Sequence, residues 1–390
     1  MIVSQLSLTD FRNYPSLDIE LRRGANLFVG SNGQGKTNLV ESVNYLSTLG
    51  SHRVQADAAL IRQDQDAAII RARLVSGERD LLVEVQINRS QPNRAQVNRS
   101  AIKARELPRY FSSVLFAPED LALVRGDPAG RRRFMDELLV LRSPRMASVL
   151  ADYDRVLRQR NTLLKSARAS RVATEEPATL EIWGDRLAQL GSEIIVARSG
   201  LVDELAPELA RAYAQIAGAD HAPRLRNQLS ILGADAEAPE REGSLDAGTV
   251  GSMSLDATTA AFADAIRRVR RAELDRAITL VGPHRDDLVL ELNGLPARGY
   301  ASHGESWSFA LALKLASAGI LRAESQLGDP VLILDDVFAE LDESRRGRLA
   351  NAIRDYEQVL ITAAVFGDVP EELAGHVVRI RAGAVVRDGQ

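Results

Sequence analysis

The chain has 390 residues, 26% of them charged and 45% hydrophobic, with a formal net charge of −4 and no cysteine. This length allows two or three units of ordinary globular composition, and the lack of cysteine excludes disulfides, thiol nucleophiles and cysteine-bound metals. The N-terminal residues lack the apolar core of a secretory signal, and no apolar run approaches the ~20 residues that cross a bilayer, so we expect a cytoplasmic protein without a membrane partner.

The first third of the chain is predicted to form strands around one helix. Apolar and polar residues alternate over 2–8 and 17–21, and the apolar run 26–29 ends at Gly30, a pattern typical of half-buried strands followed by a buried one. A helix is expected over about 36–49. Further strands are expected at 67–74, 81–87, near 97 and at 113–116. We interpret the strands between 67 and 97 as an antiparallel patch added to a parallel sheet.

The middle of the chain is predicted to be helical, and the last third returns to an α/β pattern. Apolar residues recur at helical spacing over about 129–217, whereas 233–260 is rich in Gly, Ala, Ser and Asp, which predicts a mobile loop. A long helix is expected over about 305–326, with strands at 279–282, 288–292, 331–334 and 358–363. We therefore predict a split α/β head, 1–120 and 276–390, and a helical arm insertion, 121–275.

A phosphate-binding motif lies between the third expected strand and the first expected helix. Residues 30–37, GSNGQGKT, match G-x-x-x-x-G-K-[ST] in the context that this motif requires. Its glycines allow backbone N–H groups and the helix N-terminus to face phosphates. Lys36 would neutralise the β- and γ-phosphates, and the Thr37 hydroxyl would ligate Mg²⁺. The predicted nucleotide contacts here are Gly30, Ser31, Asn32, Gly33, Gln34, Gly35, Lys36 and Thr37.

Two carboxylates end a strongly apolar strand near the C-terminus. Residues 331–334, VLIL, are followed by Asp335 and Asp336. A strand of this composition is typical of the centre of a parallel sheet, whose carboxyl edge is where α/β proteins bind ligands. Asp335 would hold Mg²⁺ directly or through water, and Asp336 would orient the attacking water or accept its proton.

The order of further motifs resembles that of the ABC-type ATPases. Ser302-His303-Gly304-Glu305 stands at the start of the long helix, and Leu341-Asp342 follows the acidic strand. Four other segments make the resemblance closer to the RecF family of bacterial recombination-mediator ATPases: 11–14 (FRNY), 116–121 (FAPEDL), 131–134 (RRRF) and 282–287 (GPHRDD). The fold that the resemblance implies is an ABC-type P-loop ATPase head, related to structural-maintenance-of-chromosomes heads, with an added antiparallel patch and a short helical arm.

The resemblance also implies how ATP is bound and hydrolysed. ATP is sandwiched in an ATP-dependent homodimer, so Ser302 and Gly304 of one head would contact the γ-phosphate on the other, and Arg12 would lie near the nucleotide. The catalytic set is then Lys36, Ser302, Gly304 and Asp336. Three departures predict slow hydrolysis: Glu305 replaces the usual signature Gln, the ABC glutamine loop is not recognisable, and Thr362 stands where transporter ATPases carry a switch histidine.

The implied function is ATP-dependent DNA binding in recombinational repair and replication restart. The family resemblance implies a weak, DNA-stimulated ATPase that promotes loading of the recombinase RecA at single-stranded gaps with RecO and RecR, and that has a role in the SOS response. Local charge supports a DNA partner independently: 89–109 carries +5 and 125–171 carries +7, and affinity for a polyanion depends on such clusters rather than on net charge.

Several alternatives stay open from the residues. A nucleotide-binding subunit of a membrane transporter would use the same motifs, but with a switch histidine and a shorter interval between Lys36 and Ser302. A P-loop kinase or GTPase would not need the Ser302 segment. Residues 282–287 are expected to be structural or to couple the heads, and 131–133 either contact DNA phosphates or form a solvated helix face.

Overall fold

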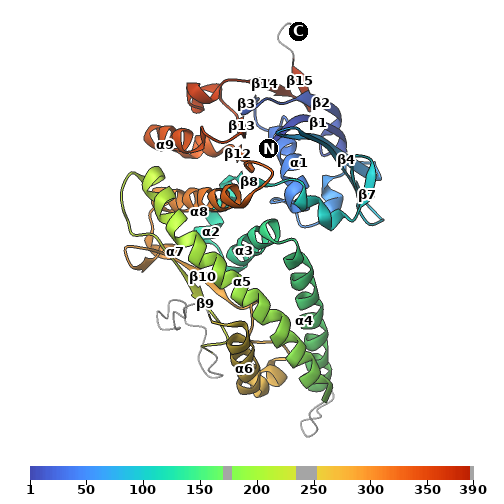
Figure 1. Ribbon diagram of the computed structural model, residues 1–390, viewed down its shortest axis with the longest axis vertical. Coiled ribbons are helices and arrows are strands. Elements are labelled where there is room, and N and C mark those ends of the chain that lie inside the picture. The colour runs from blue at the N-terminus through green and yellow to red at the C-terminus, as the bar shows by residue number, and fades with distance from the viewer. Residues whose placement is uncertain (170–177, 234–252, 387–390) are drawn as a thin grey trace. The chain divides into compact units, whose positions relative to one another are not determined.

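The computed structural model describes residues 1–169, 178–233 and 253–386, and the chain divides into two compact units. The first unit comprises 1–121, 208–220 and 302–390, and the second comprises 122–207 and 221–301. Residues 276–301, which the sequence placed in the head, thus belong to the second unit, and 208–220, which it placed in the arm, belong to the first. Figure 1 labels many of the elements described below.

A mostly parallel sheet forms the centre of the first unit. Its strand order is β15-β14-β3-β13-β12-β8, and all neighbours pair in parallel except β15, which is antiparallel to β14. The strands are β3 (Gly24–Val29), β8 (Ser113–Phe116), β12 (Val331–Asp335), β13 (Gln358–Ala363), β14 (Val377–Arg381) and β15 (Ala384–Val386). Every residue of β12 and β13 is buried, as expected for central strands that are covered on both faces.

The first unit also contains a six-stranded antiparallel sheet with the order β2-β1-β4-β5-β6-β7. Buried and more exposed residues alternate along β4, which is the pattern of a sheet with one face on a core. The strands are β1 (Ile2–Phe11), β2 (Tyr14–Glu20), β4 (Ala67–Ser76), β5 (Arg79–Asn88), β6 (Arg94–Val97) and β7 (Ser100–Ile102). The predicted antiparallel patch is therefore confirmed, and the two N-terminal strands also belong to it.

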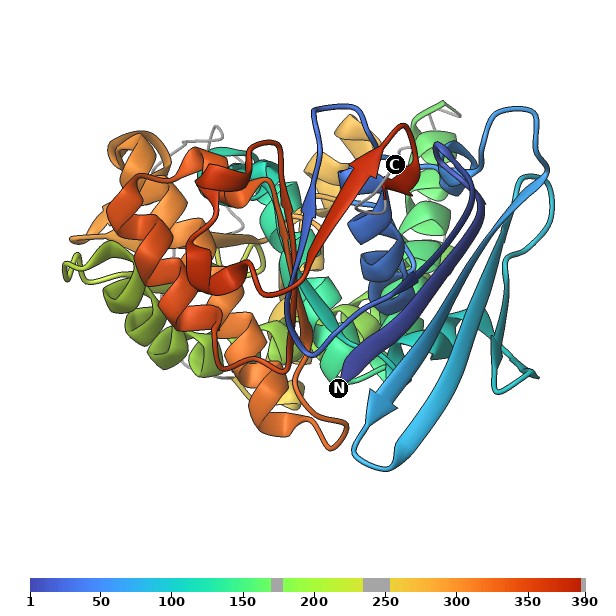
Figure 2. The ribbon, with the colours of Figure 1, turned by 90° about the horizontal axis from the view of Figure 1, so that it is seen from above.

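Helices of the first unit lie against these sheets. Helix α1 contacts β8, β12 and β13 of the parallel sheet and β4 of the antiparallel one, and it lies between them in Figure 2. Helix α8 contacts β8. Arg348 of α9 donates hydrogen bonds to the carbonyls of Ile216 and Ala217 and so caps the last turn of α5. The helices are α1 (Lys36–Thr48), α8 (His303–Glu324), α9 (Glu343–Ile353) and the end of α5 (Ala178–Ala217), with short 3₁₀ turns at Asp57–Leu60, Ala104–Arg109, Pro118–Asp120, Val337–Glu340, Phe366–Asp368 and Glu371–Leu373.

The second unit combines helices with a small antiparallel sheet. Strand β10 pairs with β9 and β11, so residues 288–292, which the sequence assigned to the head, pair within this unit. Helix α3 contacts α4 and β10, and α4 contacts α6. The elements are α2 (Leu121–Arg125), α3 (Pro128–Arg142), α4 (Arg145–Ala169), α5 up to Pro207, β9 (Arg224–Gln228), α6 (Leu255–Arg276), β10 (Asp287–Leu292), β11 (Leu295–Pro296) and α7 (Ala297–Tyr300).

Two local predictions in this region differ from the structure. Residues 279–282 are not a strand: the backbone N–H of Thr279 donates to Asn161 and that of Leu280 donates to Glu273, so side chains replace the ladder bonds of a sheet. Of the predicted loop 233–260, residues 234–252 lie outside the described residues. Ser254 accepts a hydrogen bond from the N–H of Ala257 and caps α6, so 255–260 are helical.

Candidate nucleotide site at the edge of the parallel sheet

The phosphate loop follows β3 and ends at the start of α1. Its backbone is left-handed at Gly33 and Gly35, with φ of 80° and 110°, a region that favours glycine. A Cβ atom at Gly35 would lie only 2.7–2.9 Å from side-chain atoms of Asn13 and Tyr14. Glycine at this position thus allows both the required backbone conformation and the close approach of the β1–β2 turn.

The β1–β2 turn and the β14–β15 turn both form hydrogen bonds with Gln34 of the phosphate loop. Its carbonyl oxygen accepts hydrogen bonds from Gly383 N (3.0 Å) and from the Asn13 side-chain amide (3.3 Å), and its Oε1 accepts one from Ala382 N (2.6 Å). Tyr14 donates to the Gly35 carbonyl at 2.9 Å. The β14–β15 turn was not predicted from the sequence, although the alternation over 377–381 and the following Gly383 could have indicated a hairpin.

The two motifs predicted to bind Mg²⁺ meet at the carboxyl edge of the sheet. The Thr37 hydroxyl donates to Asp335 Oδ1 at 3.0 Å, although the two residues are far apart in sequence. Lys36 is buried, and its Nζ donates to the Ser31 carbonyl at 3.3 Å. Hydroxyl and carboxylate oxygens are hard ligands that suit Mg²⁺, which usually retains several waters.

The acid pair is held by the neighbouring strand β13. Thr362 donates to Asp335 Oδ1 at 2.6 Å and accepts a hydrogen bond from Asp336 N at 2.9 Å. Burial raises the pKa of Asp335 to about 6, and the hydrogen bond from Thr362 acts in the opposite direction. Asp336 Oδ1 is buried and has no hydrogen-bond partner within the described part of the chain. Such an orphaned acceptor next to the phosphate loop fits a site for Mg·ATP and an attacking water.

Arg12, a predicted nucleotide contact, is paired with a buried carboxylate. Its Nε and Nη2 donate to the two carboxylate oxygens of Glu41 at 2.9 and 2.8 Å, and its Nη1 donates to the Ala59 carbonyl at 3.1 Å. Ser51 also donates to Glu41 at 2.5 Å. The structure therefore places Arg12 as a link between the β1–β2 turn and α1, and its contact with nucleotide stays a prediction.

The signature segment begins α8 with a capping box. Ser302 Oγ accepts from Glu305 N at 3.3 Å, and Glu305 Oε2 accepts from Ser302 N at 2.8 Å. A capping box needs only an acceptor at this third helical position, so Glu and Gln serve equally. This explains how Glu305 can replace the usual Gln: its carboxylate is bonded to the Ser302 backbone.

An arginine covers the same signature segment. The guanidinium of Arg345 lies against Gly304, so that a Cβ atom on Gly304 would come within 2.7 Å of it, and it donates to Asp342 at 2.5 Å. Among the described residues, Ser302 and Gly304 form no hydrogen bond with 30–37. Burial raises the pKa of Tyr213; the charge of Glu305 also raises it, and the charge of Arg345 lowers it. The Glu305 carboxylate and the Arg345 guanidinium therefore both lie near this tyrosine.

In the second unit, several arginines that looked suited to DNA are structural. Arg131 is 4% exposed and binds both carboxylate oxygens of Asp287, at 2.7 and 2.8 Å, which contradicts a phosphate contact by this residue. Arg132 donates to the Asp286 carbonyl at 2.7 Å, and Arg133 pairs with Glu137. Arg131 and Arg132 therefore connect α3 to the 282–287 segment, whereas Arg133 forms its ion pair within α3.

The 282–287 segment is partly buried in the same unit. The Tyr153 hydroxyl and His284 Nδ1 are 2.7 Å apart, and burial lowers the pKa of His284 to about 4, so this histidine is neutral near pH 7. Ser230 donates to Asp286 Oδ1 through its N–H and its hydroxyl. These contacts give the segment a structural role.

The basic segment 89–109 differs from the basic segment 125–171 in the exposure and pairing of its cations. All of its basic residues are exposed, and none of them forms an ion pair within the described part of the chain. One lies on β6, two lie in the turns that follow β5 and β6, and three lie beyond β7. These residues are Arg89, Arg94, Arg99, Lys103, Arg105 and Arg109. Unpaired exposed cations of this kind define the basic surface that is best placed to meet a polyanion.

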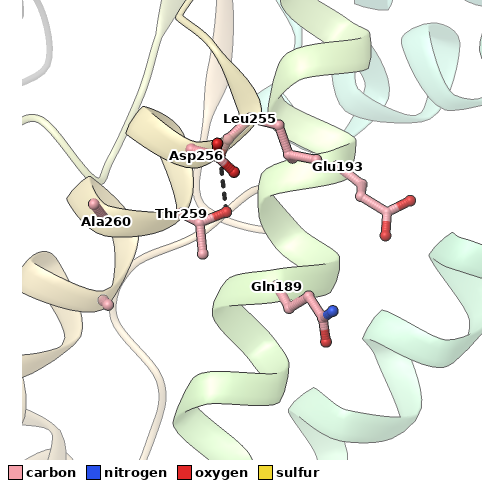
Figure 3. Close-up of a pocket in the computed structure, with 7 residues that line it drawn as sticks. Gln189, Glu193, Leu255, Asp256, Thr259 and Ala260 are labelled. Atoms are coloured by element: carbon pink, nitrogen blue, oxygen red, sulfur yellow. Dashed lines mark hydrogen bonds between the residues drawn. The ribbon is translucent and has the colours of Figure 1, made fainter.

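A pocket of about 490 Å³ in the second unit does not resemble a nucleotide site. It lies between α5 and α6 (Figure 3) and is lined by Gln189, Glu193, Leu255, Asp256, Thr259, Ala260 and Ala263. No cation lines it, and Arg145 binds its Glu193 at 2.7 Å. Anionic phosphates would meet carboxylates here.

The fold and the site together define an ABC-type ATPase head of the kind found in SMC proteins. The family described as "RecF/RecN/SMC N terminal domain" matches residues 2–373. The chain belongs to the RecF family: it is 64% identical to "DNA replication and repair protein RecF" of Clavibacter sepedonicus, over 99% of this chain and 95% of that protein. It is 62% identical to the protein of the same name from Leifsonia xyli subsp. xyli (strain CTCB07), over 99% of both chains.

Solved structures agree with this assignment. A "recombination mediator protein RecF-ATPrS in RecFOR pathway" aligns with a TM-score of 0.85 at 26% identity, over 98% of this chain and 97% of that one. An SMC head bound to the C-winged helix domain of ScpA aligns with a TM-score of 0.51 at 13% identity, over 99% and 96%, which is likeness of fold alone. None of the described helices is long and apolar enough to cross a membrane. The transporter, kinase and GTPase alternatives are set aside because the chain belongs to the RecF family.

Proposed function

We propose that this protein is an ATP-dependent DNA-binding ATPase of recombinational repair and replication restart. The observation that carries the proposal is the contact of Thr37 with Asp335, which joins the phosphate loop to the acid pair in a chain of the RecF family. One solved relative is described as RecF-ATP in the RecFOR pathway, with a TM-score of 0.83. That relative supports ATP as the nucleotide.

The residues divide the work of hydrolysis as follows. Residues 30–35 would supply N–H groups to the phosphates, Lys36 would supply a positive charge, and Thr37 and Asp335 would hold Mg²⁺. The metal ion, when bound, neutralises charge on the phosphates. Asp336 orients the attacking water.

ATP would also join two copies of the chain. The Ser302 hydroxyl uses a lone pair to accept from Glu305 N, so its proton remains available to the γ-phosphate on a second copy, and the Gly304 N–H would act beside it. Because Glu305 adds negative charge near that phosphate, we expect weak, slow turnover. Stimulation of that turnover by DNA is what the family resemblance implies.

The DNA partner would be recognised without base specificity. The exposed cations of 89–109 would contact the phosphate backbone of duplex or gapped DNA. Binding there would assist loading of RecA at gaps, together with RecO and RecR, in the cytoplasm and with a role in the SOS response. The printed description of the solved relatives as recombination mediators of the RecFOR pathway supports this role.

Light scattering after gel filtration tests the dimer model. The wild type, Lys36→Arg and Ser302→Arg are compared without nucleotide, with ADP and with ATP. We expect a wild-type dimer with ATP only, and we expect Ser302→Arg to remain monomeric while it still binds ATP, because its long side chain obstructs the start of α8 without touching the chain's own phosphate loop. A wild type that stays monomeric with ATP, or a Ser302→Arg protein that dimerises normally, would contradict the model.

A further inference from the structure

We propose that Thr362 is a positioning residue for ATP hydrolysis, which holds the metal-binding carboxylate and the water-orienting residue with one hydroxyl group. The inference rests on the proposed ATPase function. Thr362 is fully buried at the end of β13, and the strand register places it directly opposite Asp335 on β12. Its hydroxyl is 2.6 Å from Asp335 Oδ1 and 2.9 Å from Asp336 N.

The direction of both hydrogen bonds follows from the chemistry of the partners. The Asp336 backbone N–H can only donate, so the Thr362 oxygen accepts it and its single proton goes to Asp335 Oδ1. Thr37 donates to the same carboxylate oxygen at 3.0 Å. Two hydroxyl groups therefore fix Asp335 through Oδ1, which sets the orientation of the carboxylate toward the metal.

Asp336 depends on the same hydroxyl through its backbone. Its φ of 52° lies in the left-handed region, which is unfavourable for a residue with a side chain and persists only where the surroundings enforce it. The hydrogen bond from its N–H to Thr362 is such a constraint. Its side-chain Oδ1 is buried, and no hydrogen bond from the described residues fixes that oxygen.

The size of Thr362 separates its role from that of a residue that contacts the nucleotide. A threonine hydroxyl extends only one bond beyond Cβ, and here it forms one hydrogen bond with Asp335 and one with Asp336. Thr362 thus acts on Asp335 and Asp336 and reaches the phosphates only through them. Its loss should alter metal-dependent steps while it leaves the phosphate loop intact.

Three variants test this assignment. Thr362→Val keeps the shape and removes the hydroxyl group, and Thr362→Ser keeps the hydroxyl group. Thr258→Val is a matched control, because Thr258 is also fully buried but its hydroxyl is bonded to the Ser254 carbonyl within the first turn of α6. For each protein we would measure kcat and KM for ATP, ATP affinity with Mg²⁺ and with EDTA, and the melting temperature.

We expect Thr362→Val to lower kcat by about tenfold or more, since a small misplacement of a catalytic group has effects of this order. It should also lose most of the gain in ATP affinity that Mg²⁺ gives, with affinity in EDTA unchanged. Thr362→Ser should restore both properties to within about twofold, and Thr258→Val should behave like the wild type.

Other outcomes overturn the assignment. Thr362→Val with wild-type kcat and a normal Mg²⁺ effect would remove any positioning role. A serine variant as impaired as the valine variant would show that packing, not the hydroxyl, matters, and equal loss of affinity in EDTA would indicate damage to the phosphate loop. If the wild type itself hydrolyses no ATP, the proposed function fails, and the Mg²⁺ dependence of binding still decides the role of Thr362.

Discussion

Two buried carboxylates are stabilised to different extents by their neighbours. Glu41 is fully buried, but Arg12 binds both of its oxygens and Ser51 adds a third hydrogen bond, which offsets the cost of removing a charge from water. Asp286 is 3% exposed and has hydrogen bonds from Ser230 at Oδ1, while its Oδ2 is buried and has no partner in the part of the chain that the structure describes. The charge on Asp286 is therefore less well compensated.

This difference predicts a pH-dependent stability that Asp286→Asn removes. Burial raises the pKa of Asp286 to about 6 from 3.8, despite nearby Arg198 and Arg132, so the folded state favours the protonated form. The stabilising contribution is fully present below the unfolded pKa and is lost as pH rises through about 6. Asn keeps the acceptor and does not ionise. Relative to the wild type, the variant should gain up to about 3 kcal/mol in the free energy of unfolding as pH rises from about 4 to about 7.5.

Urea denaturation of both proteins at each pH measures this gain. His284, whose pKa is lowered to about 4, loses its own stabilising contribution as pH falls through that value, but it is present in both proteins and cancels from the difference. A difference between variant and wild type that is the same at low and neutral pH would show that folding does not raise the pKa of Asp286.

At the scale of elements, the C-terminal hairpin supports the phosphate loop without being part of it. The turn between β14 and β15 donates two backbone hydrogen bonds to Gln34. Gly383 has φ of 71°, and a Cβ atom there would lie 2.6 Å from the Asn13 carbonyl oxygen. The hairpin and the β1–β2 turn thus meet on the outer side of the loop, and the loop's geometry depends on both.

Replacement of Gly383 by alanine should therefore weaken nucleotide binding. The added methyl group would displace the turn from Asn13 and break its bonds to Gln34; two hydrogen bonds lost correspond to about tenfold in affinity. Gly375→Ala is the control, since a Cβ atom at Gly375 meets nothing within 4 Å and its φ is not left-handed. Calorimetric titration with ADP measures both variants. Equal ADP affinity for Gly383→Ala and the wild type would exclude support by the hairpin.

The same elements show how far sequence reasoning reaches. The sequence predicts the loop after β3, the acid pair at the end of β12 and the helix after Ser302, because each combines a local period with a chemical motif. The pairing of β10 with β9 was missed because a period of two identifies a strand but not its partner. Arg131 was counted among surface cations because its partner Asp287, far away in sequence, is visible only in the fold.

At the scale of the whole molecule, net charge and accessible charge differ. The chain carries −4 overall, but many arginines of the segment 125–171 are paired with carboxylates, including Arg133, Arg155 and the fully buried Arg160, which binds Glu273 at 2.5 Å. The cations of 89–109 are exposed and form no ion pair with any residue that the structure describes. Since exposed cations release counterions from DNA, the cations of 89–109 should contribute most of the binding free energy for DNA.

Removal of Arg99, Lys103 and Arg105 together by alanine should then weaken DNA binding strongly. If each neutralises one phosphate, the slope of log K against log salt falls by roughly 2.7 for duplex DNA, and affinity at low salt falls at least tenfold.

The control replaces three exposed cations of α4, which are Arg158, Lys165 and Arg168, and should change affinity by less than about twofold. Fluorescence anisotropy with unrelated duplex sequences over a range of NaCl concentrations measures both, and ATP-dependent dimerisation checks that each head is intact. Equal losses in the two triple variants would show that α4 binds DNA as well, and a loss confined to the α4 variant would move the DNA surface to the second unit.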